Sequence, residues 1–269
     1  MGVLRFTILG CGSSAGVPRI GRVWGKCDPH NPRNKRRRCS LLIERQGAAG
    51  STIALIDTSP DMRAQLLGAG IDKLDGVFYT HSHADHVHGI DDLRQIVFTM
   101  ENRLSVWANE PTGAELVTRF GYLFETPAGS SYPPILNLHI IDSPVTISGD
   151  GGDITLIPFA AEHGSITALG YRIGPLAYLP DGVALPPASW TTLDGIHCWI
   201  VDALRRKPHP SHAHLALSLE WLKQSGAARG ILTNMHLDMD YDELLSELPP
   251  HVEPAYDGMV IEYDLPDRP

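Results

Sequence analysis

The sequence lacks any run approaching the ~18 consecutive apolar residues that a membrane-spanning helix needs. It also lacks an excess of basic residues: the 269 residues carry a net charge of −9. That balance argues against a broad nucleic-acid-binding surface, which usually needs basic excess. With 43% hydrophobic residues, the chain can bury a sizeable core, and a soluble globular protein without a membrane partner is expected.

Cysteine is scarce as well. The four thiols, at Cys11, Cys27, Cys39 and Cys198, are too few and too scattered for a disulfide scaffold. The N-terminal residues have no charged stretch followed by a long apolar run, so no signal peptide is expected. Both absences favour a cytoplasmic location.

Histidine, in contrast, is concentrated in one stretch, Tyr79–Gly89. Three histidines and a carboxylate fall between His81 and His86, and packing does not explain that density. Imidazole and carboxylate together are the ligand set that zinc or a neighbour such as manganese prefers. A short buried strand is predicted over 76–80 and a helix after Gly89, so the cluster is predicted on a strand-to-helix loop.

The loop predicts one metal site and leaves room for a second ion. On extended backbone, His81 and His83 point the same way and can bind one ion. Past the bend, Asp85 and His86 can turn towards a second ion. His88 lies outside this pattern and is expected only at a helix start or a pocket rim.

Further candidate ligands follow predicted strands. His163 follows a strand at 154–159, Asp181 follows one at 176–179, and His236 follows one at 230–233. Asp57 ends a strand at 52–56, where it could cap a helix or orient a ligand histidine. Strands alternate with helices around a largely β middle, which predicts two packed sheets with helices outside, in one domain over 1–269.

Three features stay open. The glycine-rich stretch Gly10–Pro18 lacks the spacing of a dinucleotide fingerprint; it is a plain turn or a close approach of backbone to a metal or phosphate. The basic run Arg33–Arg38 is a solvated loop or, if it faces the metals, recruits an anionic substrate. Cys27, His30 and Cys39 could bind a structural zinc, although a closed site needs four ligands.

The order of these blocks resembles the metallo-β-lactamase superfamily over nearly the whole chain. The resemblance implies an α/β (α+β) fold, the αββα four-layer sandwich with two mixed sheets and helices on the outer faces. It also implies two divalent metal ions, with zinc expected first and manganese or iron as alternatives. The implied ligands are His81, His83 and His163 for one ion, Asp85, His86 and His236 for the other, and Asp181 as the bridge, together with a water or hydroxide.

Two further stretches, Leu9–Pro18 and Pro208–Leu215, resemble PhnP-type phosphodiesterases, relatives of RNase Z. In that group a histidine just before a helix, separate from the metal ligands, assists the leaving group. His212 is the best match, with His209 and His214 as nearby alternatives. The resemblance implies a phosphoric diester hydrolase acting on small, including cyclic, sugar- or nucleotide-phosphate esters, with catalytic candidates His212, Asp85 and His214.

Other activities of the same fold stay open. RNase Z-like RNA processing is one, although the chain has no long glycine-rich, basic arm of the kind that grips tRNA. A glyoxalase II-type thioester or lactone hydrolase is another; the 208–214 block argues against it, because a thiolate leaves without a general acid. A non-catalytic metal protein would not need a second ligand set. The expected partner is a small phosphate-ester or nucleotide-like substrate, and a homodimer stays open.

Overall fold

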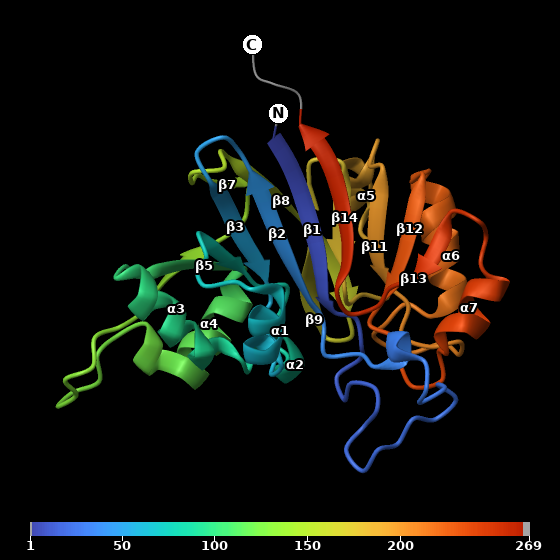
Figure 1. Ribbon diagram of the computed structural model, residues 1–269, viewed down its shortest axis with the longest axis horizontal. Helices are drawn as coiled ribbons and strands as arrows, with labels where there is room; N and C mark the ends of the chain where they lie inside the picture. The colour runs from blue at the N-terminus through green and yellow to red at the C-terminus, as the bar shows by residue number, and fades with distance from the viewer. Residues whose placement is uncertain (1, 266–269) are drawn as a thin grey trace. The chain divides into compact units, whose positions relative to one another are not determined.

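The computed structural model describes residues 2–265, which divide into two compact units built from separate segments of the chain (Figure 1). Unit one takes the described residues up to 9, then 40–155, and those from 260 onward. Unit two takes residues 10–39 and 156–259. The single domain expected over 1–269 stays a prediction.

The first sheet has seven strands in the order β14-β1-β2-β3-β4-β5-β6. Strand β2 pairs antiparallel with β3, whereas β3, β4, β5 and β6 run parallel. The sheet is therefore mixed. Its strands are β14 (Met259–Leu265), β1 (Gly2–Gly10), β2 (Ser40–Gln46), β3 (Ser51–Ile56), β4 (Gly76–Phe78), β5 (Leu104–Ala108) and β6 (Leu136–Ile140).

Helices cover one face of this sheet. Leu66, Leu93 and Leu116 come from three of them and share a buried core with strand residues Leu55 and Val77. Burial of such apolar side chains is the main stabilising contribution to this unit. The helices are α1 (Met62–Ala69), α2 (Ala84–Val87), α3 (Leu93–Met100) and α4 (Glu110–Phe120), with 3-10 turns at Ile90–Asp92 and Gly121–Leu123.

The second sheet also has seven strands, in the order β13-β12-β11-β10-β9-β8-β7. Strands β8, β9 and β10 pair antiparallel, whereas β10, β11, β12 and β13 pair parallel. The carboxyl ends of the parallel strands therefore share one edge. The strands are β7 (Val145–Ile147), β8 (Ile154–His163), β9 (Ile166–Ile173), β10 (Leu176–Leu179), β11 (Cys198–Asp202), β12 (Arg229–Thr233) and β13 (Val252–Pro254).

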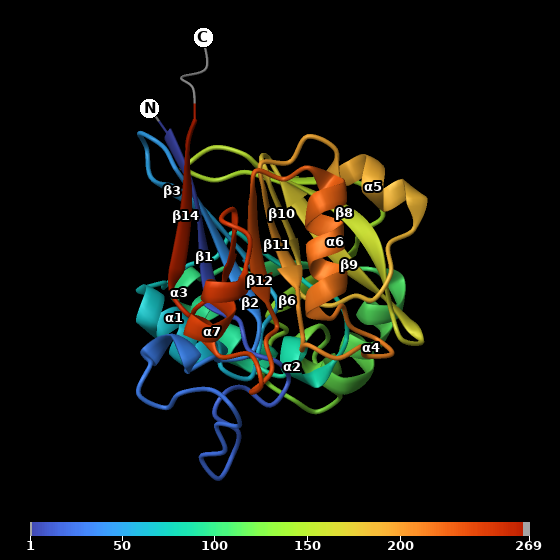
Figure 2. The ribbon, with the colours of Figure 1, turned by 90° about the vertical axis from the view of Figure 1, so that its right-hand side faces the viewer.

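Helix α6 (Leu215–Ser225) packs along this sheet (Figure 2). The Trp221 ring lies parallel to that of Trp199 on β11, with 6.2 Å between centroids, and Ser218 Oγ donates to the Asp202 carbonyl at 2.6 Å. The helix ends where Gly226 adopts the left-handed conformation that glycine accepts without strain. Its first turn therefore has a fixed position relative to the carboxyl end of β11.

The expected two mixed sheets flanked by helices are confirmed. Three elements were not predicted: α5 (Pro187–Leu193), α7 (Tyr241–Glu247) and β13. Two predicted boundaries also shift, because β8 continues to His163 and a helical turn, α2, already begins at Ala84 inside the histidine cluster. No helix in the part of the chain between residues 2 and 265 is long and apolar enough to cross a membrane.

Candidate metal centre

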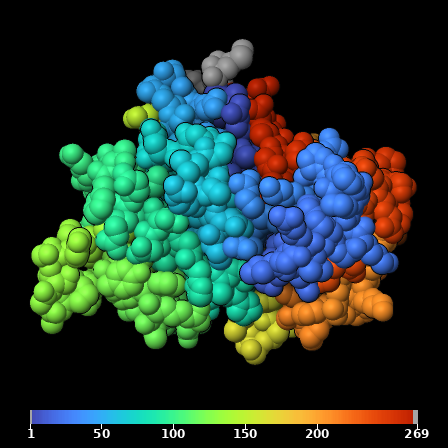
Figure 3. All heavy atoms as spheres, turned by 60° about the horizontal axis from the view of Figure 1, so that its bottom comes forward, coloured from blue at the N-terminus to red at the C-terminus, as the bar shows by residue number. Residues whose placement is uncertain are grey.

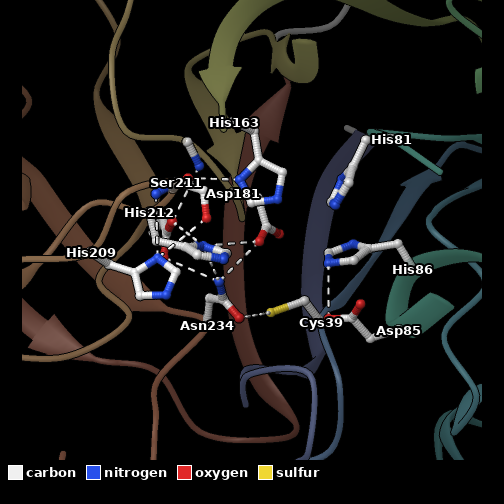
Figure 4. A network of polar contacts seen from close by, with 12 residues as sticks. Cys39, His81, Asp85, His86, His163, Asp181, His209, Ser211, His212 and Asn234 are labelled. Atoms are coloured by element: carbon white, nitrogen blue, oxygen red, sulfur yellow. Dashed lines mark hydrogen bonds and ion pairs between the residues drawn. The ribbon is translucent and has the colours of Figure 1, made fainter. Parts of the chain in front are cut away.

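The histidine cluster of unit one lies between β4 and α3, where the predicted strand-to-helix loop is found. His81 and His86 are buried, and their ring centroids are 4.3 Å apart (Figure 4). His83 is exposed, with its ring 4.6 Å from that of His81. Asp85 Oδ2 lies 3.5 Å from His86 Nε2. All four predicted ligands of this loop therefore converge.

Asp57 supports this cluster from the carboxyl end of β3. Its buried carboxylate accepts from the Thr80 N–H at 2.8 Å and the Thr80 hydroxyl at 2.7 Å, and lies 2.7 Å from His86 Nδ1. Burial raises the pKa of Asp57, and the nearby His86 opposes that rise. Since α1 begins only at Met62, the orienting role fits and the capping role does not.

Asp57→Ala is expected to lower the free energy of unfolding by about 3–5 kcal/mol, the usual cost of breaking a buried charged pair. The physical reason is that the Thr80 and His86 donors would be left in a water-free interior. Denaturant titration with a chelator present measures this change without any contribution from bound metal. Asp72→Ala, at an exposed position, is the matched control. Equal midpoints for the two variants would contradict the account of Asp57.

Unit two brings together a second cluster. The metal-binding atoms of His163, Asp181 and His212 all lie within 4.8 Å of one another. His163 is the last residue of β8, Asp181 follows β10, and His212 lies in the loop before α6 (Figure 4). His163 and Asp181 are buried and His212 is half-buried. Predicted ligands from separate strand ends thus meet the predicted general acid.

His212 contacts two carboxylates through Nδ1. Its Nδ1 lies 3.0 Å from Asp202 Oδ2 and 3.1 Å from Asp181 Oδ1. Burial raises the pKa of Asp202 to about 7, while the contact with His212 opposes that rise. A carboxylate on Nδ1 fixes the ring and leaves the Nε2 edge for proton transfer.

Asp202 and Asn234 belong to this cluster, although neither was among the predicted site residues. The Asn234 side-chain amide donates to Asp181 Oδ1 at 3.1 Å and to Asp202 Oδ1 at 3.2 Å. Asp202 ends β11 and Asn234 follows β12, and these strands are parallel neighbours. Polar residues at the carboxyl ends of adjacent parallel strands were the available signal.

The third predicted ligand of unit two, His236, has contacts of its own. Its Nδ1 is 2.7 Å from Asp238 Oδ1, and its Nε2 contacts the Arg19 guanidinium. No group of three mutually close metal-binding atoms within residues 2–265 includes His236 or His214. His214 precedes the first residue of α6, where its carbonyl accepts from the Ser218 N–H.

The two remaining histidines of interest lie outside these ligand groups. His209 contacts the Ser211 hydroxyl through Nδ1 at 3.2 Å, and its ring centroid lies 5.0 Å from that of His212. Burial lowers the pKa of His209. His88 packs edge-on against Phe120, with centroids 5.8 Å apart, so its described contact is one of packing.

One pattern unites four of the predicted ligands. In each of these imidazoles Nδ1 lies within 3.0 Å of an oxygen, so that a proton on Nδ1 leaves the Nε2 lone pair for a metal. Protein oxygens orient metal-bound histidines in this way. The pairs are His81 with Thr80 Oγ1, His86 with Asp57, His163 with the Ser211 carbonyl, and His236 with Asp238.

The structure does not support a structural zinc at Cys27, His30 and Cys39. Cys27 Sγ lies 3.8 Å from an Arg36 guanidinium nitrogen, and Cys39 Sγ lies 3.6 Å from the Gly12 carbonyl. Over the described range 2–265, no group of three close ligand atoms includes Cys27, His30 or Cys39. The positive charge of Arg36 beside the Cys27 thiol would also repel a bound cation.

The basic run is largely engaged within unit two, whose segment 10–39 is coloured blue in Figure 3. Arg33 lies over the Tyr241 ring at 4.8 Å, Arg36 is only 2% exposed, and Arg37 pairs with Asp257 at 2.9 Å. These contacts assign the run a structural role. In the glycine-rich stretch, a Cβ on Gly12 would meet the backbone oxygen of Arg36 at 3.0 Å, so this glycine allows two backbone segments of unit two to pass closely.

Comparisons with known proteins show the family of this chain. The family model described as beta-lactamase superfamily domain matches residues 52–235. A crystal structure of a diphosphatase from the PhnP family is 34% identical, with a TM-score of 0.85 over 98% of both chains. The short form of human tRNase Z is 17% identical, with a TM-score of 0.65 over 96% of this chain and 98% of that one, which shows the shared fold.

Another relative carries the name of an acyltransferase. A protein from Porphyromonas gingivalis named octanoyltransferase is 37% identical over 262 residues, or 95% of this chain. The match covers 51% of that relative, so the chain spans about half of its length. The remaining half of the relative has no counterpart in this sequence.

Proposed function

Because the chain belongs to the β-lactamase superfamily, we propose that it is a binuclear metal-dependent phosphodiesterase acting on small phosphate esters, diphosphate diesters among them. The β-lactamase superfamily match and the similarity to a PhnP-family diphosphatase support a metal-dependent hydrolase. The observation that carries the finer proposal is His212, which is held by Asp202 beside His163 and Asp181. Hydrolysis of a thioester would not need that histidine.

The donor set suits divalent cations. We assign His81, His83 and His163 to one ion, Asp85, His86 and His236 to the other, and Asp181 to both, following the family pattern. The four histidines with an oxygen at Nδ1 are the structural support for this assignment. When bound, two such cations lower the pKa of a water to about 7 and neutralise phosphate oxygens.

Residues of the chain orient the catalytic groups and donate the proton. The Asn234 amide and the Asp202 carboxylate hold Asp181 and His212 in fixed orientations. An imidazolium at His212 donates a hydrogen bond from Nδ1 to the Asp202 carboxylate and gives its Nε2 proton to the oxygen of the departing alcohol. General-acid assistance of this kind contributes about 10²–10⁴-fold to rate. A diphosphate diester, whose leaving group is a phosphate, depends on it less.

A substrate panel tests the proposal. Protein of measured metal content is assayed against an alkyl phosphodiester, an aryl phosphodiester, a dinucleoside diphosphate, a thioester and a lactone. The proposal expects chelator-sensitive turnover of the phosphorus esters above that of the two acyl substrates. Preference for an acyl substrate would overturn it.

Acyl chemistry is the second candidate function, because the Porphyromonas gingivalis relative carries the name octanoyltransferase. Since the match covers about half of that relative, its named activity can belong to the other half. An octanoyl thioester in the same panel decides the point. Turnover of that thioester above all phosphodiesters would favour the second candidate.

A further inference from the structure

Unit two has a small hairpin at residues 19–23, to which the proposed function assigns no role. Arg19 and Val23 exchange backbone hydrogen bonds of 3.0 and 3.3 Å, and Gly21 and Arg22 adopt positive φ at the turn. The tip carries an apolar side chain into solvent, since Ile20 is 100% exposed and Val23 is 50% exposed. The tip of the hairpin is therefore accessible to a ligand.

The base of this hairpin is fixed beside His236. Val17 exchanges backbone hydrogen bonds with Arg36, and the Lys26 N–H donates to the Leu237 carbonyl at 2.8 Å. Gly25 packs so closely on Leu237 that a Cβ there would fall 2.5 Å from the Leu237 carbonyl oxygen. The hairpin therefore has an anchored base next to a proposed metal ligand and an exposed tip.

Arg19 reaches from the hairpin to that ligand. Its guanidinium contacts His236 Nε2, while Asp238 accepts from His236 Nδ1 at 2.7 Å. The guanidinium thus covers the lone pair that the proposed function gives to a metal. A bound cation would take that lone pair and repel the guanidinium, which would leave its N–H donors beside the centre.

We propose that Arg19 is a substrate-binding residue that donates to a non-bridging phosphate oxygen of the ester. This inference rests on the proposed function. Guanidinium presents paired donors that match phosphate oxygens. The binding group is then a cation on a hairpin rather than the basic run 33–38, whose arginines have other contacts.

The test compares Arg19→Ala with Arg22→Ala, which removes the same charge from the tip of the same hairpin. Binding of a non-hydrolysable phosphonate diester to the metal-loaded proteins is measured by calorimetry, so that the readout does not depend on turnover. Arg19→Ala is expected to weaken binding about 10- to 100-fold, the loss of a charge-assisted hydrogen bond. In steady-state assays the same loss should appear in KM, and Arg19→Lys should restore part of it.

Metal affinity provides the second readout, by competition with a chelator. Arg19→Ala should bind zinc at least as tightly as the unaltered protein, because nothing then covers His236 Nε2. A large loss of zinc in Arg19→Ala would overturn the proposal by showing that Arg19 only supports His236. Equal phosphonate binding by Arg19→Ala and Arg22→Ala would also overturn it. Failure of the proposed function differs from both, because the unaltered, metal-loaded protein would then turn over no phosphodiester.

Discussion

Replacing His212 by alanine is expected to lower the turnover of an alkyl phosphodiester by about 10²–10⁴-fold. The ring lies with Nδ1 on Asp202 Oδ2 at 3.0 Å, which leaves Nε2 to protonate the departing oxygen. An alkoxide is a poor leaving group without that proton. An aryl oxide leaves far more readily, so the same variant should lose much less activity on an aryl phosphodiester.

The ratio of the two losses, measured as kcat on each substrate, is the diagnostic quantity. Elemental analysis accompanies it, because the atoms of His212 also lie within 4.8 Å of those of His163 and Asp181. A variant that retains its metals but loses alkyl turnover selectively supports the general acid. Equal losses on both substrates, or loss of metal, would show that His212 binds substrate or metal instead.

His214 is the natural comparison, because it lies two residues further along and was an alternative for the same role. The structure places it directly before α6 and outside the ligand groups. His214→Ala should therefore cost less alkyl turnover than His212→Ala. A selective alkyl loss in His214→Ala alone would transfer the assignment to His214.

Asp181→Ala is expected to remove metal from the purified protein. The carboxylate is buried, accepts from the Asn234 amide at 3.1 Å and lies within reach of both His163 and His212. Loss of a residue that only orients a ligand costs about 10–100-fold in metal affinity, so loss of a ligand should cost at least that much. Phosphodiester hydrolysis should fall with it.

Inductively coupled plasma analysis of Asp181→Ala, in metal equivalents per chain, checks this expectation. Asp194→Ala, which removes an exposed carboxylate of the same unit, is the control. Full metal content in Asp181→Ala would show that this residue does not bridge the ions. A folded variant is required for that conclusion, and circular dichroism establishes it.

The parts of the site that the sequence predicts are those with a local pattern. The spacing of His81, His83, Asp85 and His86 marks a metal loop before any fold is known, and the structure brings these side chains together. Asp202 and Asn234 have no such pattern. They acquire meaning only because β11 and β12 are parallel neighbours whose ends meet, which is a property of the sheet.

Contacts between distant residues explain what else was missed. Arg19 and His236 are 217 positions apart, and no periodicity links them. Helix α7, in contrast, carried a readable signal, since Asp240 with Glu243 three residues later is a helix-start pattern. The structure shows the Asp240 carboxylate accepting from the Glu243 N–H at 3.0 Å. Helix α7 could therefore have been predicted from the sequence.

We expect phosphodiester hydrolysis by this protein to need two metal ions. The most direct test is to titrate metal-free protein with zinc or manganese while the initial rate on one alkyl phosphodiester is recorded. The account predicts no rate without metal and a rise that reaches its plateau at two equivalents per chain. A plateau at one equivalent, or full activity in the metal-free protein, would contradict it.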